Sequence, residues 1–86
     1  MQKLTYFKLA SCPYCRECDR FIEQLRGEYP AYRDIEIEII DEDRQPDIAE
    51  KFDYYYVPTF FIGSKKLHEG ASTKEKIKAV LDAALA

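Results

Sequence analysis

The sequence contains no uninterrupted apolar segment approaching the ~20 residues that a membrane-spanning helix requires. Its first residues also lack the apolar stretch and the small-residue cleavage site of a secretory signal peptide. We therefore expect a cytoplasmic protein with no membrane partner. Repeats, linkers and low-complexity segments are absent too, which argues against a collagen-like or disordered chain. An ordinary globular domain, most simply a monomer, is the expectation.

Positive charge is not in excess. The chain has 13 Lys and Arg against 16 Asp and Glu, a net charge of −3 at pH 7. Because nucleic-acid binding depends on a basic face, we expect no nucleic-acid partner. No basic residue interrupts the stretch between Arg33 and Arg44, which holds Asp34, Glu36, Glu38, Asp41, Glu42 and Asp43. We interpret this stretch as a solvated edge, with a docking strip for a basic partner as the alternative.

Cysteine is scarce and confined to one place. Cys12, Cys15 and Cys18 fall within seven positions, whereas disulfide scaffolds spread their cysteines along the chain. A structural zinc site needs four ligands, and only His68 is available to join the cysteines. On a helix, Cys12 and Cys18 would also lie about 120° apart. We therefore expect no metal site and no tightly bound cofactor.

The 86 residues, 47% of them hydrophobic and 34% charged, have room for a single domain spanning residues 1–86. Runs of β-forming or alternating apolar residues predict strands over residues 4–9, 34–40, 59–62 and 66–69. The second of these has one polar face, which places it near a sheet edge. Gly63 and Ser64 predict a tight turn between the last two strands.

Apolar residues at helical spacing predict helices over residues 13–27, 46–52 and 73–85. Gly27 is expected to end the first helix, and Ser72 to cap the last in a capping box with Glu75. Strands separated by a helix must be parallel, whereas the last two form an antiparallel hairpin. This predicts an α/β fold with a four-stranded mixed sheet flanked by three helices, in the order strand–helix–strand–helix–strand–strand–helix.

Cys12-Pro13-Tyr14-Cys15 lies where the first strand gives way to the first helix. The thiolate is the nucleophile in disulfide exchange, and a free cysteine is mostly protonated at neutral pH. Unpaired N–H groups at a helix N-terminus favour the anion, and Lys8 is expected to add a positive charge nearby. Cys12 is therefore predicted to attack. Cys15, one turn deeper, is predicted to resolve the mixed disulfide.

Two further residues have a structural interpretation. Cys18 lies on the apolar stripe of the first predicted helix, and free cysteine often serves as a small core residue. A regulatory thiol is the alternative for Cys18. His68 lies in a predicted strand of alternating polar and apolar residues, and the sequence offers no evident acid–base partner for it. We therefore expect His68 to be structural.

The run Tyr54-Tyr55-Tyr56-Val57-Pro58 precedes the third predicted strand. A proline at the start of a strand removes one backbone donor and is a candidate for a cis peptide bond. If this loop lies beside Cys12, the backbone of Val57 is free to pair with an extended substrate segment. The alternative is a plain loop that enters a strand, with the tyrosines packing the short helix.

The Cys12–Cys15 motif ahead of a helix, with Val57-Pro58 opening the third strand and Ile62-Gly63 closing it, resembles the glutaredoxin branch of the thioredoxin superfamily. The resemblance covers essentially the whole chain in length and element order. It implies a thioredoxin-like fold with Cys12 as nucleophile. Glutathione is implied as a co-substrate, held at Lys8, Tyr14, Val57, Pro58, Ser72 and Thr73.

The chain departs from that family's pattern at two places. Tyr56 precedes Val57, where the family usually has threonine. The segment from Glu69 to Thr73 replaces the usual Gly-Gly and the residues after it. The last helix of the family receives a glutathione carboxylate at its N-terminus. Glu69 places a negative charge near that anion and is expected to weaken its binding.

The leading hypothesis is a glutaredoxin-like thiol–disulfide oxidoreductase that reduces protein disulfides or glutathione mixed disulfides. The first alternative is a disulfide reductase of the same shape that a thioredoxin reductase recycles in place of glutathione. From another class, the chain is a non-enzymatic module, either an iron–sulfur carrier that uses Cys12 or a domain that docks partners through its groove.

Overall fold

The computed structural model describes residues 1–86 and contains one four-stranded sheet in the order β2-β1-β3-β4. Its strands are β1 (Leu4–Lys8), β2 (Ile37–Asp41), β3 (Thr59–Ile62) and β4 (Lys65–Glu69). The central strand β1 pairs in parallel with β2 and antiparallel with β3, and β3 continues into the antiparallel hairpin with β4. The α/β fold with a four-stranded mixed sheet is confirmed.

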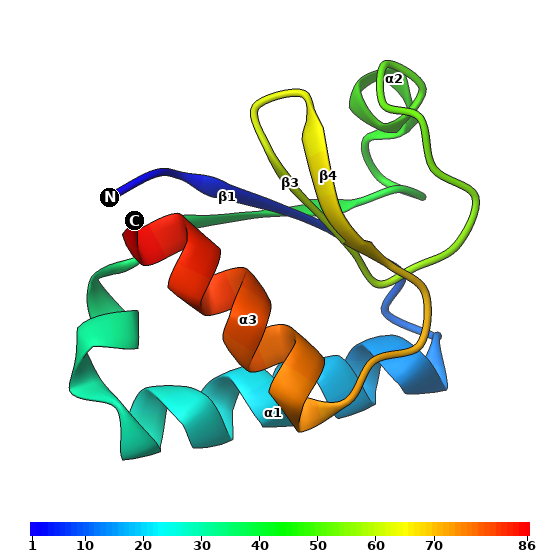
Figure 1. The fold of residues 1–86 in the computed structure, drawn as a ribbon. Helices are drawn as coiled ribbons and strands as arrows, with labels where there is room; N and C mark the ends of the chain where they lie inside the picture. The colour runs from blue at the N-terminus through cyan, green and yellow to red at the C-terminus, as the bar shows by residue number, and fades with distance from the viewer.

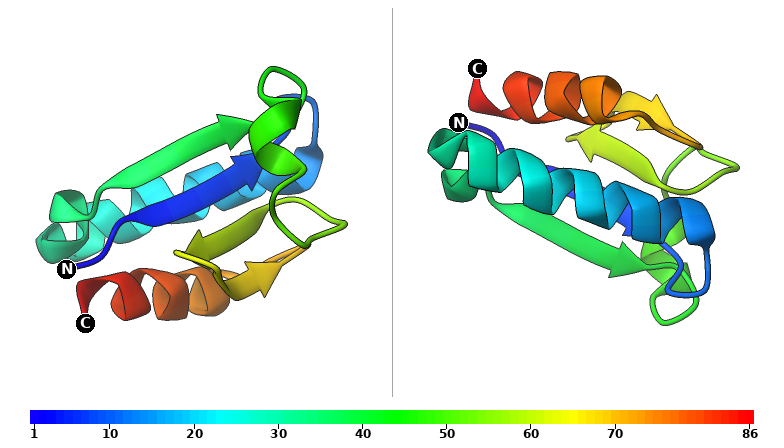
Figure 2. Two further views of the ribbon diagram at one scale, coloured as in Figure 1. Left: turned by 90° about the horizontal axis from the view of Figure 1, so that it is seen from above. Right: turned by 90° about the horizontal axis from the view of Figure 1, so that it is seen from below.

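Helices cover both faces of this sheet. Helix α1 (Pro13–Glu28) and helix α3 (Lys74–Leu85) lie side by side on one face, and the short helix α2 (Pro46–Ala49) lies on the other (Figure 1). Figure 2 shows α2 over the carboxyl-terminal ends of β1 and β2. None of these helices has the length and apolar character needed to cross a lipid bilayer.

The apolar residues of β1 supply both faces of the core. Leu4 and Tyr6 point toward α1 and α3, where they pack with Leu25, Phe60, Ile77 and Leu81. Phe7 points to the opposite face and packs with Ile40 and Phe61 beneath α2 and the loop that follows it. Because β1 is buried on both sides, the position of its carboxyl end is well defined, and Cys12 follows that end by four residues.

The second strand is shorter than predicted and starts later. Residues 30–34, part of which was predicted as strand, form a 3-10 helix, η1 (Pro30–Asp34). The guanidinium of Arg26 donates to the carbonyls of Tyr32 (3.3 Å) and Ile35 (3.0 Å), so these backbone groups are withdrawn from the sheet. The predicted edge position is confirmed, because β2 has a neighbour on one side only and Ile39 is 57% exposed.

Three helix ends also differ from the prediction. Gly27 does not end α1, which continues to Glu28 and stops because Tyr29 is extended (φ −128°, ψ 93°) ahead of Pro30. Ser72 is not the N-cap of α3. The cap is Thr73, whose hydroxyl accepts a hydrogen bond from the Lys76 N–H at 3.2 Å. The predicted capping box with Glu75 is therefore wrong by one position. Helix α2 is likewise shorter than predicted and ends before Phe52.

The different burial of two isoleucines predicts that their replacement by alanine has very different effects on stability. Ile77 is fully buried between α3 and the sheet, whereas Ile39 is mostly exposed on the edge strand. We expect Ile77→Ala to lower the free energy of unfolding by about 2–5 kcal/mol. Ile39→Ala, the matched control, should change it by less than about 1 kcal/mol. Urea unfolding monitored by circular dichroism measures both, and equal losses would contradict this description of the core.

Candidate redox site

Cys12 is the N-cap residue of α1, with an extended backbone (φ −82°, ψ 120°). Its carbonyl accepts the first helical hydrogen bonds from the N–H groups of Cys15 (3.1 Å) and Arg16 (3.2 Å). Pro13 occupies the first helical position, and no acidic residue lies in the first turn. The Cys12 side chain is partly exposed, so its sulfur is accessible and lies at the positive end of the helix dipole.

Cys15 and Cys18 lie beneath Cys12 on the same helix, and neither is exposed at all. Burial raises the pKa of the Cys15 thiol to about 12, and its hydrogen bond with the Cys12 side chain acts in the same direction. Burial also raises the pKa of the Cys18 thiol to about 11. Both thiols are therefore protonated near neutral pH. Cys18 packs in the main core with Ile22 and Leu25, as its structural interpretation predicted.

The loop before β3 completes the site from the other half of the chain. The Val57–Pro58 peptide bond is cis, as the sequence suggested, and the Val57 carbonyl oxygen lies 3.9 Å from the Cys12 Sγ. The Pro58 carbonyl accepts a hydrogen bond from the Gly70 N–H at 2.8 Å, which ties the loop to the end of β4. No backbone carbonyl accepts the Val57 N–H.

Exposed aromatic side chains lie close in the sequence to Cys12 and to Val57. Tyr14, two residues after Cys12, is 57% exposed, and Tyr56, directly before Val57, is 70% exposed. Tyr55 is 85% exposed. Tyr54, by contrast, packs against Phe7 in the smaller core cluster. Within the tyrosine run, Tyr54 is therefore a core residue, whereas Tyr55 and Tyr56 are exposed.

Lys8 has a partner that the sequence did not reveal. Its Nζ lies 2.6 Å from Oδ2 of Asp19 on α1, and the hydroxyl of Tyr6 donates to Oδ1 of the same carboxylate at 2.7 Å. The Tyr6 hydroxyl also lies 3.3 Å from the carbonyl oxygen of Cys15. Burial, followed by the nearby Cys18 and Asp19, raises the pKa of Tyr6. The ammonium of Lys8 is thus paired within the chain.

The signal that could have found this pair is helical spacing. Asp19 lies four residues after Cys15, so both residues share one face of α1. Lys8 and Tyr6 point to the same face of β1, since they are two residues apart. Only the packing of α1 on β1 brings these two periodic patterns together.

Two of the three residues at the start of α3 have side-chain partners. The hydroxyl of Thr73 caps the helix, and Lys74 pairs with Glu28 at 2.6 Å. The Oγ of Ser72 is buried and has no hydrogen-bond partner. His68 pairs through Nε2 with the Gly70 carbonyl (2.8 Å), in line with its predicted structural role. No group of three His, Cys, Asp or Glu side chains is arranged to hold a metal ion.

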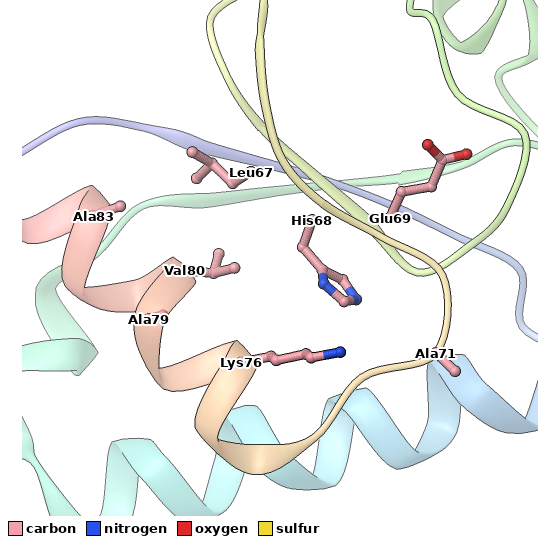
Figure 3. A pocket seen from close by; sticks show the side chains of 8 residues that line it. All are labelled: Leu67, His68, Glu69, Ala71, Lys76, Ala79, Val80 and Ala83. Carbon is pink, nitrogen blue, oxygen red and sulfur yellow. The ribbon is translucent and has the colours of Figure 1, made fainter.

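A pocket of about 450 Å³ lies apart from the cysteines, between β4 and α3 (Figure 3). Apolar side chains, among them Leu67 and Val80, form part of its wall. The side chains of His68 and Lys76 extend into this pocket, whereas the Glu69 carboxylate points away from them. Neither Cys12 nor Val57 lines it, so the chemistry of the thiols belongs to the surface around Cys12.

Disulfide exchange requires an accessible sulfur and a second sulfur within reach that stays protonated until it is needed. Cys12 and Cys15 meet both conditions at the junction of β1 and α1. The fold and this pair of thiols define a class, the thiol–disulfide oxidoreductases with a thioredoxin-like fold.

Comparison with known proteins leads to the same class. The family model described as Thioredoxin matches residues 2–83. A thioredoxin of Methanocaldococcus jannaschii is 31% identical over 75 residues, which are 87% of this chain and 86% of that relative. The chain belongs to the thioredoxin family.

Solved structures agree with this assignment. Thioredoxin O1 from Arabidopsis thaliana in its oxidized state is 26% identical, with a TM-score of 0.69 over 96% of this chain and 77% of that one. A thioredoxin-like protein from Clostridium perfringens is 25% identical, with a TM-score of 0.68 over 98% of this chain and 71% of that one. The superfamily and the fold are thus confirmed, while the glutaredoxin branch stays a prediction.

The different environments of the three cysteines predict selective alkylation. Iodoacetamide at pH 8 should modify only Cys12 in the folded chain, because Cys15 and Cys18 are buried and protonated. All three should react after unfolding in urea. Mass spectrometry of peptides measures the sites, with Cys12→Ser as the control that should take up no label while folded. Comparable labelling of Cys15 in the folded chain would contradict the assignment.

Proposed function

We propose that the chain reduces disulfides in extended protein segments and is itself reduced by a dithiol donor of the thioredoxin-reductase kind. The observation that carries the choice of donor is the ion pair between Lys8 and Asp19, with Nζ and Oδ2 2.6 Å apart. This pair engages the cation that the family resemblance assigns to glutathione. The proposal therefore favours the first alternative from the sequence over the leading hypothesis.

The reaction proceeds in two exchanges. The Cys12 thiolate attacks one sulfur of the substrate disulfide, a mixed disulfide forms, and the other substrate sulfur leaves as a thiolate that takes a proton from water. Cys15 then attacks the Cys12 sulfur as the bond from Cys12 to the substrate breaks, and the proton of Cys15 passes to the leaving substrate sulfur, which departs as a thiol. The substrate gains two electrons, and Cys12 and Cys15 end as a disulfide.

The neighbourhood of Cys12 supports a protein substrate. The N–H of Val57 has no backbone acceptor, and its carbonyl oxygen lies 3.9 Å from the Cys12 Sγ. An extended segment that pairs with these groups would present its own cysteine to the Cys12 sulfur, as in strand addition. The exposed rings of Tyr14 and Tyr56 offer apolar contact area to the flanking residues of such a segment.

The polar groups expected to bind glutathione support a different donor. Glutathione carries two carboxylates, which need cations or free N–H donors. Lys8 is paired with Asp19, and the side chain of Thr73 takes one N–H at the start of α3. Glu69 adds a second internal carboxylate near the loop of Val57. A dithiol protein donor depends on none of these anion contacts.

Glutathione-linked reduction is the second candidate. The Cys-Pro-Tyr-Cys motif favours it, because that motif is typical of dithiol glutaredoxins. Removal of a single charge distinguishes the two donors, since Asp19→Asn keeps the acceptor for the Tyr6 hydroxyl but releases Lys8.

Cysteine variants test the reaction itself. Cys12→Ser should abolish reduction of insulin by dithiothreitol above the uncatalysed rate, because the attacking sulfur is lost. Cys15→Ser should instead accumulate a mixed disulfide with the substrate, since no thiol resolves it. Turbidity of precipitating insulin chains and intact-mass spectrometry measure the two effects. A docking module would instead show no insulin reduction by the wild-type chain and unchanged partner binding by Cys12→Ser, and an iron–sulfur carrier would show visible absorbance after anaerobic purification.

Coupled turnover tests the donor. We expect NADPH consumption with thioredoxin reductase and little with glutathione and glutathione reductase. Asp19→Asn should raise the glutathione-linked rate by up to about fivefold, the factor for a surface ion pair of ~1 kcal/mol, because Lys8 becomes available to a carboxylate. The dithiothreitol-driven rate of the same variant should stay unchanged. Activity of the wild-type chain with glutathione alone would overturn the proposed donor.

A further inference from the structure

The loop of residues 53–58 lies between α2 and β3 and belongs to no helix or strand. It nevertheless has to hold Val57 beside Cys12 with its N–H free. Two contacts act on the end of this loop near β3: the Thr59 hydroxyl donates to the Tyr56 carbonyl, and the Gly70 N–H donates to the Pro58 carbonyl. Neither of them takes up the N–H groups that precede Val57.

Glu69 supplies that missing contact. It is the last residue of β4, opposite Thr59 in the antiparallel ladder. Its Oε2 accepts hydrogen bonds from the N–H groups of both Tyr55 (2.6 Å) and Tyr56 (3.0 Å). Its Oε1 pairs with the Nζ of Lys66 at 2.6 Å. Figure 3 shows the carboxylate pointing away from the pocket and toward this loop.

The charge of Glu69 is therefore compensated on both oxygens. Lys66, followed by the N–H of Tyr55, lowers the pKa of Glu69 to about 2, so the carboxylate is ionised at any pH used for disulfide exchange. Only 20% of its side-chain surface is exposed. The interpretation of Glu69 from the sequence, as a charge that repels an anionic ligand, overlooks this internal role.

We infer that Glu69 is a positioning residue for substrate, which holds the backbone of Tyr55 and Tyr56 so that Val57 presents its N–H to an extended peptide beside Cys12. The inference rests on the proposed function, since it concerns how a protein disulfide is bound. Glu69 touches neither cysteine. Its loss should weaken the pairing of a peptide with Val57 and leave the reaction of the sulfurs intact.

The test compares two disulfide substrates of different size. One is a peptide disulfide with several residues on each side of the cysteine, and the other is hydroxyethyl disulfide, which has no backbone to pair with Val57. For Glu69→Ala we expect the KM for the peptide to rise about tenfold with kcat little changed, and both constants for hydroxyethyl disulfide to stay unchanged. Hydrogen exchange of the Tyr55 and Tyr56 amides, followed by NMR, should become faster.

Two variants separate positioning from charge. Glu69→Gln keeps a carbonyl oxygen for both N–H groups and should restore a KM near that of the wild type. Lys66→Gln removes the ion pair but leaves the hydrogen bonds, with the same expectation. Glu38→Ala is the matched control, because it removes another exposed ion pair, with Lys3 (3.2 Å), on the edge strand β2.

Each outcome has a definite meaning. If Glu69→Ala lowers activity equally on both substrates, or changes neither, the positioning role is overturned. If Glu69→Ala does not fold, Glu69→Asp replaces it, because the shorter side chain keeps the charge but does not reach both N–H groups, and the same selective rise in KM is expected. If the wild-type chain reduces neither substrate, the proposed function itself fails, which is a different result.

Discussion

The pairing of β1 with β3 is the constraint on which the site depends. The two strands are antiparallel, with Phe7 opposite Thr59, so the end of β1 lies beside the start of β3. Cys12 follows the end of β1, and Val57 and Pro58 precede the start of β3. One register therefore brings together a thiol and a loop that are 45 residues apart in the sequence. Burial of β1 on both faces keeps this register, because a shift by one residue would expose Phe7 or Leu4.

Solvent access differs among the three thiols and makes their reactivity different. All lie on the first turns of α1, at intervals of three residues. The N-cap position leaves Cys12 partly exposed, whereas the side chains of Cys15 and Cys18 are fully buried. Desolvation disfavours an anion on Cys15 and Cys18, so the same helix supplies one accessible sulfur and two that remain thiols. In the proposed reaction, the order of attack and resolution follows from the depth of each residue along one helix.

Local patterns were sufficient to predict most of the fold and where the paired thiols lie in it. The Cys12–Cys15 motif, the alternation in β1 and the Val57–Pro58 step are all readable within a few residues, and the structure places them as expected. The contacts of Lys8 and Glu69 were missed because their partners come from other elements. The prediction placed the N-cap of α3 one residue too early, because serine and threonine both suit this position. Only the path of the chain after β4 distinguishes Ser72 from Thr73.

The contacts of Asp19 and Glu69 have one feature in common, which bears on the choice between anionic and neutral ligands. Asp19 and Glu69 are carboxylates of the chain itself, and each engages a group that would otherwise attract an anion, the ammonium of Lys8 in one case and the N–H groups of Tyr55 and Tyr56 in the other. An incoming carboxylate must displace a carboxylate that is already in place, so its new contact replaces one that the chain already makes. Neutral backbone groups of a peptide meet no such competition at Val57, whose N–H has no backbone acceptor. In the proposed function, internal carboxylates of this kind would select against small anionic thiols and leave the surface around Cys12 to protein segments.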